Sequence, residues 1–185
     1  MTANQPLYAT RIDLAAPIRD RAIGLLNQTL ASTIDLKTQV KQAHWNVKGK
    51  DFYQLHLLFD EIASEVEEFT DMVAERITTL GGYALGTARI SAQQSELSEY
   101  PFDIADGTDH IIALADRLAI YGKSIRFCIE QTSVLGDADT ADLYTEISRA
   151  IDKRLWFLES HLHSPAASAT EQSKKPQPVA AGAIK

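Results

Sequence analysis

The amino-acid sequence predicts an all-α protein, a four-helix bundle with one long connection between its second and third helices. In four long stretches, apolar residues recur at steps of three and four, the spacing that places them on one buried helix face. The stretch 83–103 has no such period and contains Tyr100-Pro101, so we expect an extended crossover with room for a short helical turn. With 185 residues, 45% of them hydrophobic, the chain is long enough for one sizeable core.

The first helix is expected to begin at Pro17, because a proline in the first turn loses no helical hydrogen bond. It should end at residues 46–49, where the sequence Asn-Val-Lys-Gly interrupts the apolar period. Two adjoining faces of this helix are apolar, and they are formed by Leu26, Leu30 and Ile34 and by Leu36, Val40 and His44.

The second helix has the most regular pattern in the chain. Asp51 is predicted to cap its start, with Gln54 at the capping-box position, and Gly81-Gly82 is predicted to stop it. Its apolar seam consists of Phe52, Leu55, Phe59, Ile62, Val66, Phe69, Val73, Ile77 and Leu80.

The third and fourth helices follow the crossover and are separated by a turn at Leu135-Gly136-Asp137. Asp139 or Thr140 is predicted to cap the fourth helix. The apolar face of the third helix comprises Ile111, Leu114, Leu118, Tyr121, Ile125 and Cys128, and that of the fourth comprises Leu143, Ile147, Ile151, Leu155, Leu158 and Leu162. Two helix pairs joined by one long crossover form the ferritin-like variant of the four-helix bundle.

The chain divides into one domain with two extensions. We expect an N-terminal extension at 1–14, the helical domain at 15–164 and a flexible tail at 165–185, where Ala, Ser, Pro and Lys dominate.

Charge and cysteine content narrow the possible functions. The 18 Lys and Arg against 25 Asp and Glu give a net charge of −7, which disfavours nucleic acid as the main partner of the domain. The single cysteine, Cys128, cannot form an intramolecular disulfide and suits a reducing compartment. We expect no secretory signal and no membrane span, and therefore a cytoplasmic protein.

The second helix also carries a stripe of side chains that can bind a metal. His56, Asp60, Asp71 and Glu75 lie on one side of this helix, away from its apolar seam. Imidazole and carboxylate together suit a divalent ion such as Fe(II), Mn(II) or Zn(II). The competing interpretation is that the stripe is simply the solvated side of the helix.

The two pairs in this stripe cannot bind one ion within a single chain. His56 and Asp71 are fifteen residues apart, which is about 22 Å along a helix, whereas a ligand atom must lie roughly 2 Å from the ion. A two-fold axis between antiparallel copies would bring one pair against the other pair of a neighbouring chain. His44 can approach the same place from the first helix, so the sequence predicts a site shared between two chains.

A second pattern excludes the usual alternative site. Ferritin-like di-iron sites inside a bundle use Glu-x-x-His twice. No histidine in this sequence has a glutamate three residues before it, so we expect no intra-bundle di-iron site of that type.

Several segments of the sequence together resemble the Dps family of mini-ferritins, from about residue 15 to residue 163. Besides Phe52, Leu55, His56 and Phe59-Asp60, these segments are QAHWNVKG at 42–49, DMVAER at 71–76, LGGYALGT at 80–87, YP at 100–101, ADR at 115–117, DTAD at 139–142 and DKRLWF at 152–157. The combined spacing is very specific.

The resemblance implies a four-helix bundle with a short helix in its crossover, and a hollow homododecamer. It implies a two-iron ferroxidase site at the two-fold interface, with His44, His56 and Asp60 from one chain and Asp71 and Glu75 from the other. Fe(II) would be oxidised there, preferentially by hydrogen peroxide, and stored as ferric mineral, while Zn or Mn are possible substitutes in the site.

The resemblance also suggests roles for other acidic residues. Asp137, Asp139 and Asp142 lie where the family lines an iron-entry pore, although helix capping is an alternative role. Glu61, Glu65 and Glu68 form a further stripe that is either a mineral-nucleation site or a solvated face, and the solvated face is favoured.

The two termini and one turn differ from the family pattern. The turn at 133–136 is longer than in related chains, which weakens the pore assignment. Residues 1–12 contain only Arg11 as a charged residue, and the tail has Lys174, Lys175 and Lys185 against Glu171. We therefore expect weak or absent DNA binding, and a nucleoid-compacting DNA-binding protein with a secondary or structural metal site remains the alternative function.

Overall fold

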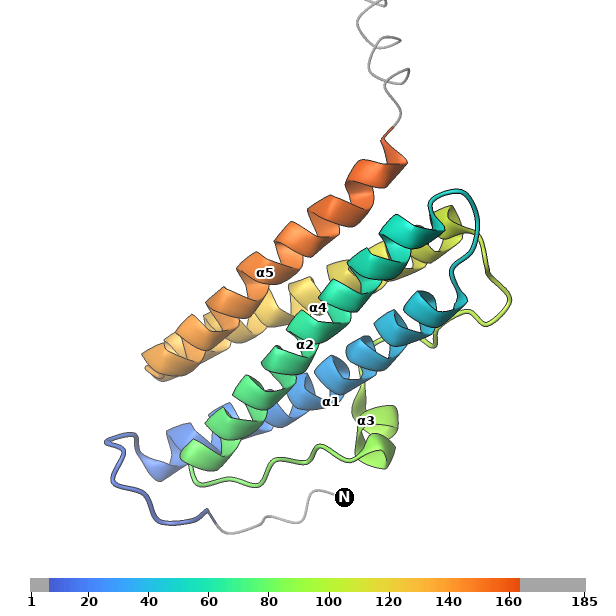
Figure 1. Ribbon diagram of the computed structural model, residues 1–185. Coiled ribbons are helices and arrows are strands. Elements are labelled where there is room, and N and C mark those ends of the chain that lie inside the picture. The colour runs from blue at the N-terminus through green and yellow to red at the C-terminus, as the bar shows by residue number, and fades with distance from the viewer. Residues whose placement is uncertain (1–6, 164–185) are drawn as a thin grey trace, which may run out of the picture.

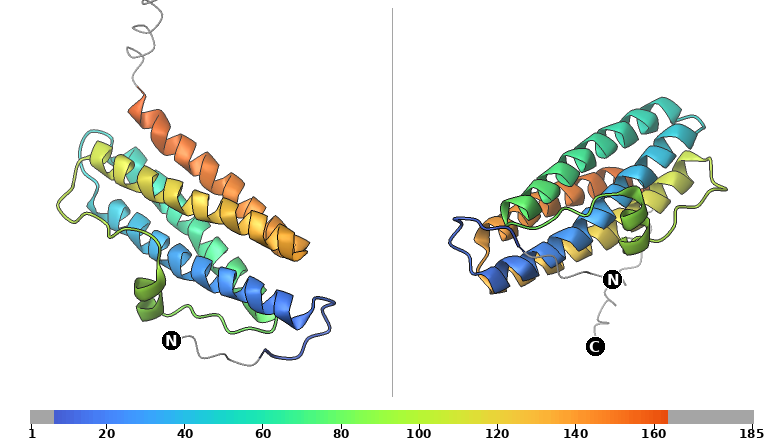
Figure 2. Two further views of the ribbon diagram at one scale, coloured as in Figure 1. Left: turned by 180° about the vertical axis from the view of Figure 1, so that it is seen from behind. Right: turned by 90° about the horizontal axis from the view of Figure 1, so that it is seen from below.

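Four long helices lie side by side in the computed structural model, which describes residues 7–163 (Figure 1). In chain order the helices are α1 (Ala16–Asn46), α2 (Phe52–Thr79), α3 (Ala88–Gln94), α4 (Gly107–Leu135) and α5 (Ala138–Leu162). The α1–α2 and α4–α5 hairpins are joined by the crossover, whose short helix α3 lies against α1 on the outside of the bundle (Figures 1 and 2). The predicted fold class is confirmed, including the short helix in the crossover.

The predicted apolar faces form the core of the bundle. Every residue of the α4 face is buried, and so is the α2 seam from Leu55 to Leu80. Phe52 at the start of α2 and Leu162 at the end of α5 are exceptions, because their side chains are 44% and 41% exposed. None of the helices within residues 7–163 is long and apolar enough to cross a bilayer.

The start of α2 differs from the prediction. Asp51 does occupy the N-cap position, but its side chain makes no capping hydrogen bond, so the predicted capping box with Gln54 is wrong. The backbone of Asp51 has φ −99° and ψ 17°, outside the extended conformation from which a cap side chain reaches back to the helix. The Gly49 carbonyl instead accepts a hydrogen bond from the Phe52 N–H at 3.2 Å.

The cap of α5 is also a different residue from the one predicted. Asp137, not Asp139 or Thr140, is the N-cap residue, and its carboxylate accepts hydrogen bonds from the Thr140 backbone N–H at 3.1 Å and the Thr140 hydroxyl at 2.6 Å. Gly136 adopts φ 78° at the end of α4 and turns the chain so that Asp137 immediately precedes α5.

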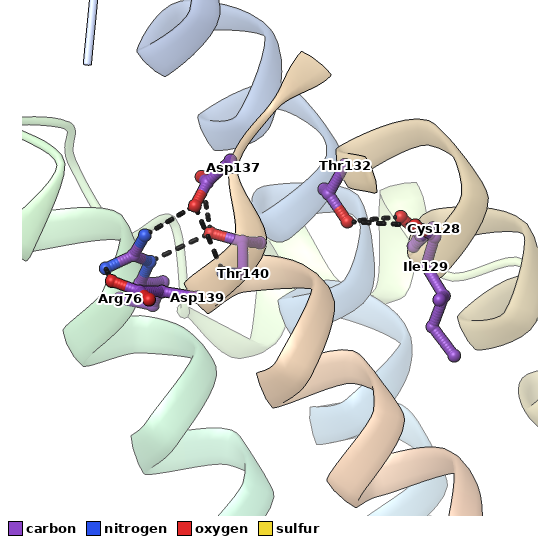
Figure 3. Close-up of polar contacts among 7 residues, drawn as sticks. All are labelled: Arg76, Cys128, Ile129, Thr132, Asp137, Asp139 and Thr140. Atoms are coloured by element: carbon purple, nitrogen blue, oxygen red, sulfur yellow. Dashed lines mark hydrogen bonds and ion pairs between the residues drawn. The ribbon is translucent and has the colours of Figure 1, made fainter. Parts of the chain in front are cut away.

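Asp137 also joins α5 to α2. Its carboxylate is 1% exposed and lies 2.7 Å from Nη2 of Arg76, whose Nε donates to the Thr140 hydroxyl at 2.8 Å (Figure 3). One buried carboxylate thus caps a helix and pairs with an arginine of another helix.

Replacing Asp137 by alanine should lower the free energy of unfolding by about 3 kcal/mol, because it removes a cap and leaves a largely buried arginine without its partner. Urea unfolding followed by circular dichroism measures this change. Asp139→Ala is the matched control, since Asp139 is 85% exposed and lies 3.8 Å from Arg76, and its unfolding midpoint should barely move. Equal effects of the two variants would contradict the assignment of the cap to Asp137.

Candidate metal centre

Three of the five predicted ligands meet where α1 ends and α2 begins. His44 projects from the last turn of α1, and His56 and Asp60 project from the first turns of α2. The two imidazole rings stack with their centroids 3.8 Å apart and an interplanar angle of 19°. His44 Nε2 lies 3.9 Å from Oδ1 of Asp60.

Reciprocal hydrogen bonds fix the two histidines. His44 Nδ1 lies 2.8 Å from the His56 carbonyl, and His56 Nδ1 lies 2.9 Å from the His44 carbonyl. A carbonyl oxygen only accepts, so each Nδ1 carries the proton and donates it. In the neutral form, the lone pair of each ring is therefore on Nε2, which is the arrangement that backbone carbonyls impose on metal-binding histidines.

Asp60 is ionised and is held by a lysine of α1. Lys41 Nζ donates a hydrogen bond to Oδ1 of Asp60 at 2.7 Å. This hydrogen bond, together with the positive charge of Lys41, holds the pKa of Asp60 below its ordinary value. The role of Lys41 could not be predicted from the sequence, because a contact between two helices leaves no spacing pattern within either one.

Asp71 and Glu75 lie far from this cluster on the same helix. Helix α2 is continuous from Phe52 to Thr79, so the separation of about 22 Å expected between the two pairs applies. Both side chains are exposed. Within residues 7–163, no three His, Cys, Asp or Glu side chains are close enough together to enclose an ion. The chain thus carries two partial sets of candidate ligands along one stripe of α2, with His56 and Asp60 half-buried and Asp71 and Glu75 exposed.

The further acidic stripe on α2 is partly neutralised by an arginine of α5, a contact that no pattern in the sequence predicts. Arg154 of α5 donates from Nε to Glu65 at 2.6 Å and from Nη1 to Glu61 at 3.2 Å. These residues line an open pocket of about 460 Å³ together with Leu57, Asp60, Ser64 and Glu68. Glu61 and Glu65 are thus ion-paired with α5, while Glu68 is exposed.

The three acids suggested for an entry pore differ in their surroundings. Asp137 is buried and committed to Arg76 and to the cap of α5 (Figure 3). Asp139 and Asp142 are exposed in the first turns of α5. Only these two carboxylates therefore face solvent in this segment.

Hydroxyl groups occupy the interior between the four long helices. Thr29 pairs with the Tyr144 hydroxyl at 3.0 Å, and Thr33 pairs with the Tyr121 hydroxyl at 2.7 Å. These four residues are buried, and such paired hydroxyls satisfy one another without a metal.

Comparison with known proteins agrees with this architecture. The family model for the ferritin-like domain matches residues 23–166. A curated relative, the "DNA protection during starvation protein" of Agrobacterium fabrum, is 41% identical over 155 residues, which cover 84% of this chain and 96% of the relative.

Solved structures give the same result. DpsC from Streptomyces coelicolor is 31% identical with a TM-score of 0.82, and the match covers 88% of this chain and 96% of that one. The Dps protein of Mycobacterium smegmatis is 28% identical with a TM-score of 0.83, over 87% of this chain and 97% of that one. The Dps protein of Vibrio cholerae, described as a member of the ferritin-like diiron-carboxylate superfamily, is 26% identical with a TM-score of 0.79, over 86% of this chain and 99% of that one. By its sequence and by its fold, the chain belongs to the Dps family of the ferritin-like superfamily.

Proposed function

We propose that this protein is a mini-ferritin that oxidises Fe(II), preferentially with hydrogen peroxide, at a site shared between two chains. The observation that carries the proposal is the stacked pair His44 and His56, whose Nδ1 atoms are both held by backbone carbonyls. The two imidazoles and the carboxylate of Asp60 are donor types that suit Fe(II). Iron is the substrate in this proposal, and the oxidised iron is stored as mineral inside a homododecameric shell.

The second chain is needed to complete the site. Asp71 and Glu75 of a neighbouring chain supply the remaining carboxylates when two antiparallel copies of α2 meet across a two-fold axis. Carboxylates favour Fe(III) over Fe(II), which makes iron easier to oxidise. Two Fe(II) ions together give hydrogen peroxide two electrons, so with two protons it becomes two water molecules and no hydroxyl radical is released.

The residues around the site prepare it for iron. The carbonyls of His44 and His56 keep the two rings oriented, which lowers the entropy lost on binding. Lys41 keeps Asp60 ionised and in place while no metal is bound, and it must give way when Asp60 binds an ion. Lys41 thus competes with the metal for one ligand.

The remaining parts of the proposal rest on the family. Proteins with the same fold carry the name Dps. By this similarity, we propose that the chains form a hollow shell in the cytoplasm and that Asp139 and Asp142 lie near the entrance for iron. Alternatively, the same side chains bind zinc or manganese in a structural role. Metal analysis of protein purified without chelators distinguishes an iron site from a zinc or manganese site.

A second function, compaction of DNA, is favoured by one specific observation. A relative that is 41% identical is named a "DNA protection during starvation protein". The basic residues considered for DNA contact, Lys174, Lys175 and Lys185, lie outside the described residues. The net charge of −7 opposes binding of the domain itself to phosphates.

Mixing two inactive variants tests whether the site is shared. His56→Ala and Asp71→Ala should each lose most of the ferroxidase activity, because each variant damages every site in its own assembly. A mixed dimer has one site with both substitutions and one site with neither. Random co-assembly makes about half of the dimers mixed, so about a quarter of all sites are intact and about a quarter of the wild-type activity should return. Iron oxidation is followed by ultraviolet absorbance after anaerobic addition of Fe(II) and peroxide.

Glu68→Ala is the control for the mixing experiment, because it removes an exposed carboxylate from α2 without touching the proposed ligands, and it should keep full activity. A mixture no more active than its two components would exclude a site divided between chains in this way.

Lys41→Met should strengthen metal binding several-fold, because Asp60 would no longer have to leave an ammonium group that holds it. Titration calorimetry with Zn(II), which is redox-inert, measures this affinity. Lys37→Met is the matched control, since Lys37 pairs with Glu67 across the same two helices and should leave the affinity unchanged. Weaker binding by Lys41→Met would instead make Lys41 a supporting residue of the occupied site.

Gel-shift assays at low and physiological salt test the DNA hypothesis. We expect weak or no retardation by the full chain, and no further loss when residues 165–185 are removed, because the domain is acidic. Clear retardation at physiological salt that disappears with the tail would favour DNA compaction as the main function.

A further inference from the structure

A row of exposed apolar side chains runs along the outer face of α4. Ile120, Phe127 and Val134 are 41%, 54% and 85% exposed. They recur every seven residues, and a step of seven turns the position on a helix by only about 20°, so the three side chains share one face. The buried apolar face of α4 contains none of them. The helix therefore carries a second apolar seam, which no element of its own chain covers.

Charged side chains alternate with the apolar ones in this row. Asp116, Lys123 and Glu130 also lie seven residues apart, and all three are exposed. In the part of the chain that the structure describes, none of the three forms an ion pair. Seven residues span about 10 Å of helix, whereas side chains on one helix pair at three or four residues. The row thus holds opposite charges that do not pair along α4 itself.

The polar side chains beside the row are already paired within the chain. On one edge, the Ser124 hydroxyl donates to Oε2 of Glu96 in the crossover at 2.8 Å. On the other edge, Nη1 of Arg126 donates to Oδ1 of Asp152 on α5 at 2.9 Å, which holds the guanidinium toward α5. Ala119 is exposed beside the row and is small. Another helix can therefore approach the row without displacing a long side chain.

The row lies across the bundle from the candidate metal ligands. Both α2 and α4 pack against α1 and α5, so these two helices occupy diagonally opposite corners of the bundle (Figures 1 and 2). The ligand stripe is on α2, and the apolar row is on α4. One chain can therefore contact one neighbour through α2 and a different neighbour through α4.

We propose that the row on α4 binds the same row of a second copy of this chain, with the two helices antiparallel. When Phe127 of each copy lies on the two-fold axis, Ile120 of one copy faces Val134 of the other. Lys123 then lies beside Glu130 of the second copy, and the same pair recurs on the other side of the axis. Asp116 lies outside the paired stretch, which runs from residue 120 to residue 134.

The charges on the row select both the partner and the orientation. In a parallel pair with equal residues level, Lys123 would face Lys123 and Glu130 would face Glu130, and like charges side by side oppose association. The antiparallel pair places each lysine against a glutamate, so the row is complementary to itself. The paired stretch is about 22 Å long, which makes a small contact of modest affinity. Covalent trapping is therefore the suitable test.

Disulfide trapping on the full chain tests the contact and its direction. Oxidation of Phe127→Cys with diamide, followed by non-reducing electrophoresis, should give mostly covalent dimer, because the two cysteines face each other across the axis. Wild type should stay uncrosslinked, since Cys128 is 4% exposed. Val134→Cys is the matched control. In the antiparallel pair its two copies are about 21 Å apart, so it should give at least about threefold less dimer than Phe127→Cys although residue 134 is more exposed.

A pair of cysteines tests the register. The double variant Ile120→Cys with Val134→Cys should form covalent dimers, although neither single variant does, because residues 120 and 134 face each other. Adding Lys123→Glu should lower this dimer yield at least about threefold, and adding Glu130→Lys as well should restore it. Lys153→Glu is the control, since it reverses an exposed charge on α5 and should leave the yield unchanged.

Three outcomes overturn the inference. The first is the absence of dimer in Phe127→Cys when its unfolding midpoint is like that of wild type. The second is equal dimer yield in Val134→Cys and Phe127→Cys, which indicates parallel or random contact. The third is an unchanged yield after Lys123→Glu. The contact does not rest on the proposed function, so adding Asp71→Ala should abolish iron oxidation and leave the trapped dimer, which separates failure of one proposal from failure of the other.

Discussion

The antiparallel register of α1 against α2 is the constraint on which the candidate site depends. Going back along α1 from His44 to Lys41 and Lys37, the partners on α2 move forward from His56 to Asp60 and Glu67. The steps are about one helical turn each on α1, and one turn and then two turns on α2, so these contacts form a ladder across one helix pair. Because the apolar seam of α2 is buried along almost its whole length, the register is set by core packing. Core packing therefore also sets the orientation of the histidine rings.

The helices could be predicted from the sequence because they depend on local periodicity, and the same periodicity placed the candidate ligands on one face of α2. A step of three or four residues specifies the face of a helix, and the length of α2 specifies that Asp71 cannot reach His56. No spacing rule within one helix shows that Lys41 holds Asp60 or that Arg154 holds Glu65, because each pair joins two different helices. The tautomers of His44 and His56 could not be predicted either, since each depends on a hydrogen bond to the backbone carbonyl of the other histidine.

The helix caps were predicted less well, and the reason is conformational. Asp51 and Asp139 are residue types that often cap helices, but a cap requires a particular backbone conformation just before the first turn. Gly136 provides that position to Asp137, which leaves Asp139 inside the helix. Asp137, one of the three acids suggested for an entry pore, therefore has a structural role, because it links α5 to Arg76 of α2.

The division of ligands along α2 has a consequence for the cell. In a single chain Lys41 holds Asp60, and the proposed partner ligands Asp71 and Glu75 lie about 16 and 22 Å farther along α2. Under the proposed function, the unassembled polypeptide is therefore a poor chelator. Any ion that needs ligands from two chains stabilises their association by mass action. If the site is shared as proposed, iron supply and subunit assembly are thermodynamically linked, and iron is oxidised only by chains that have already assembled with a partner and can store the product.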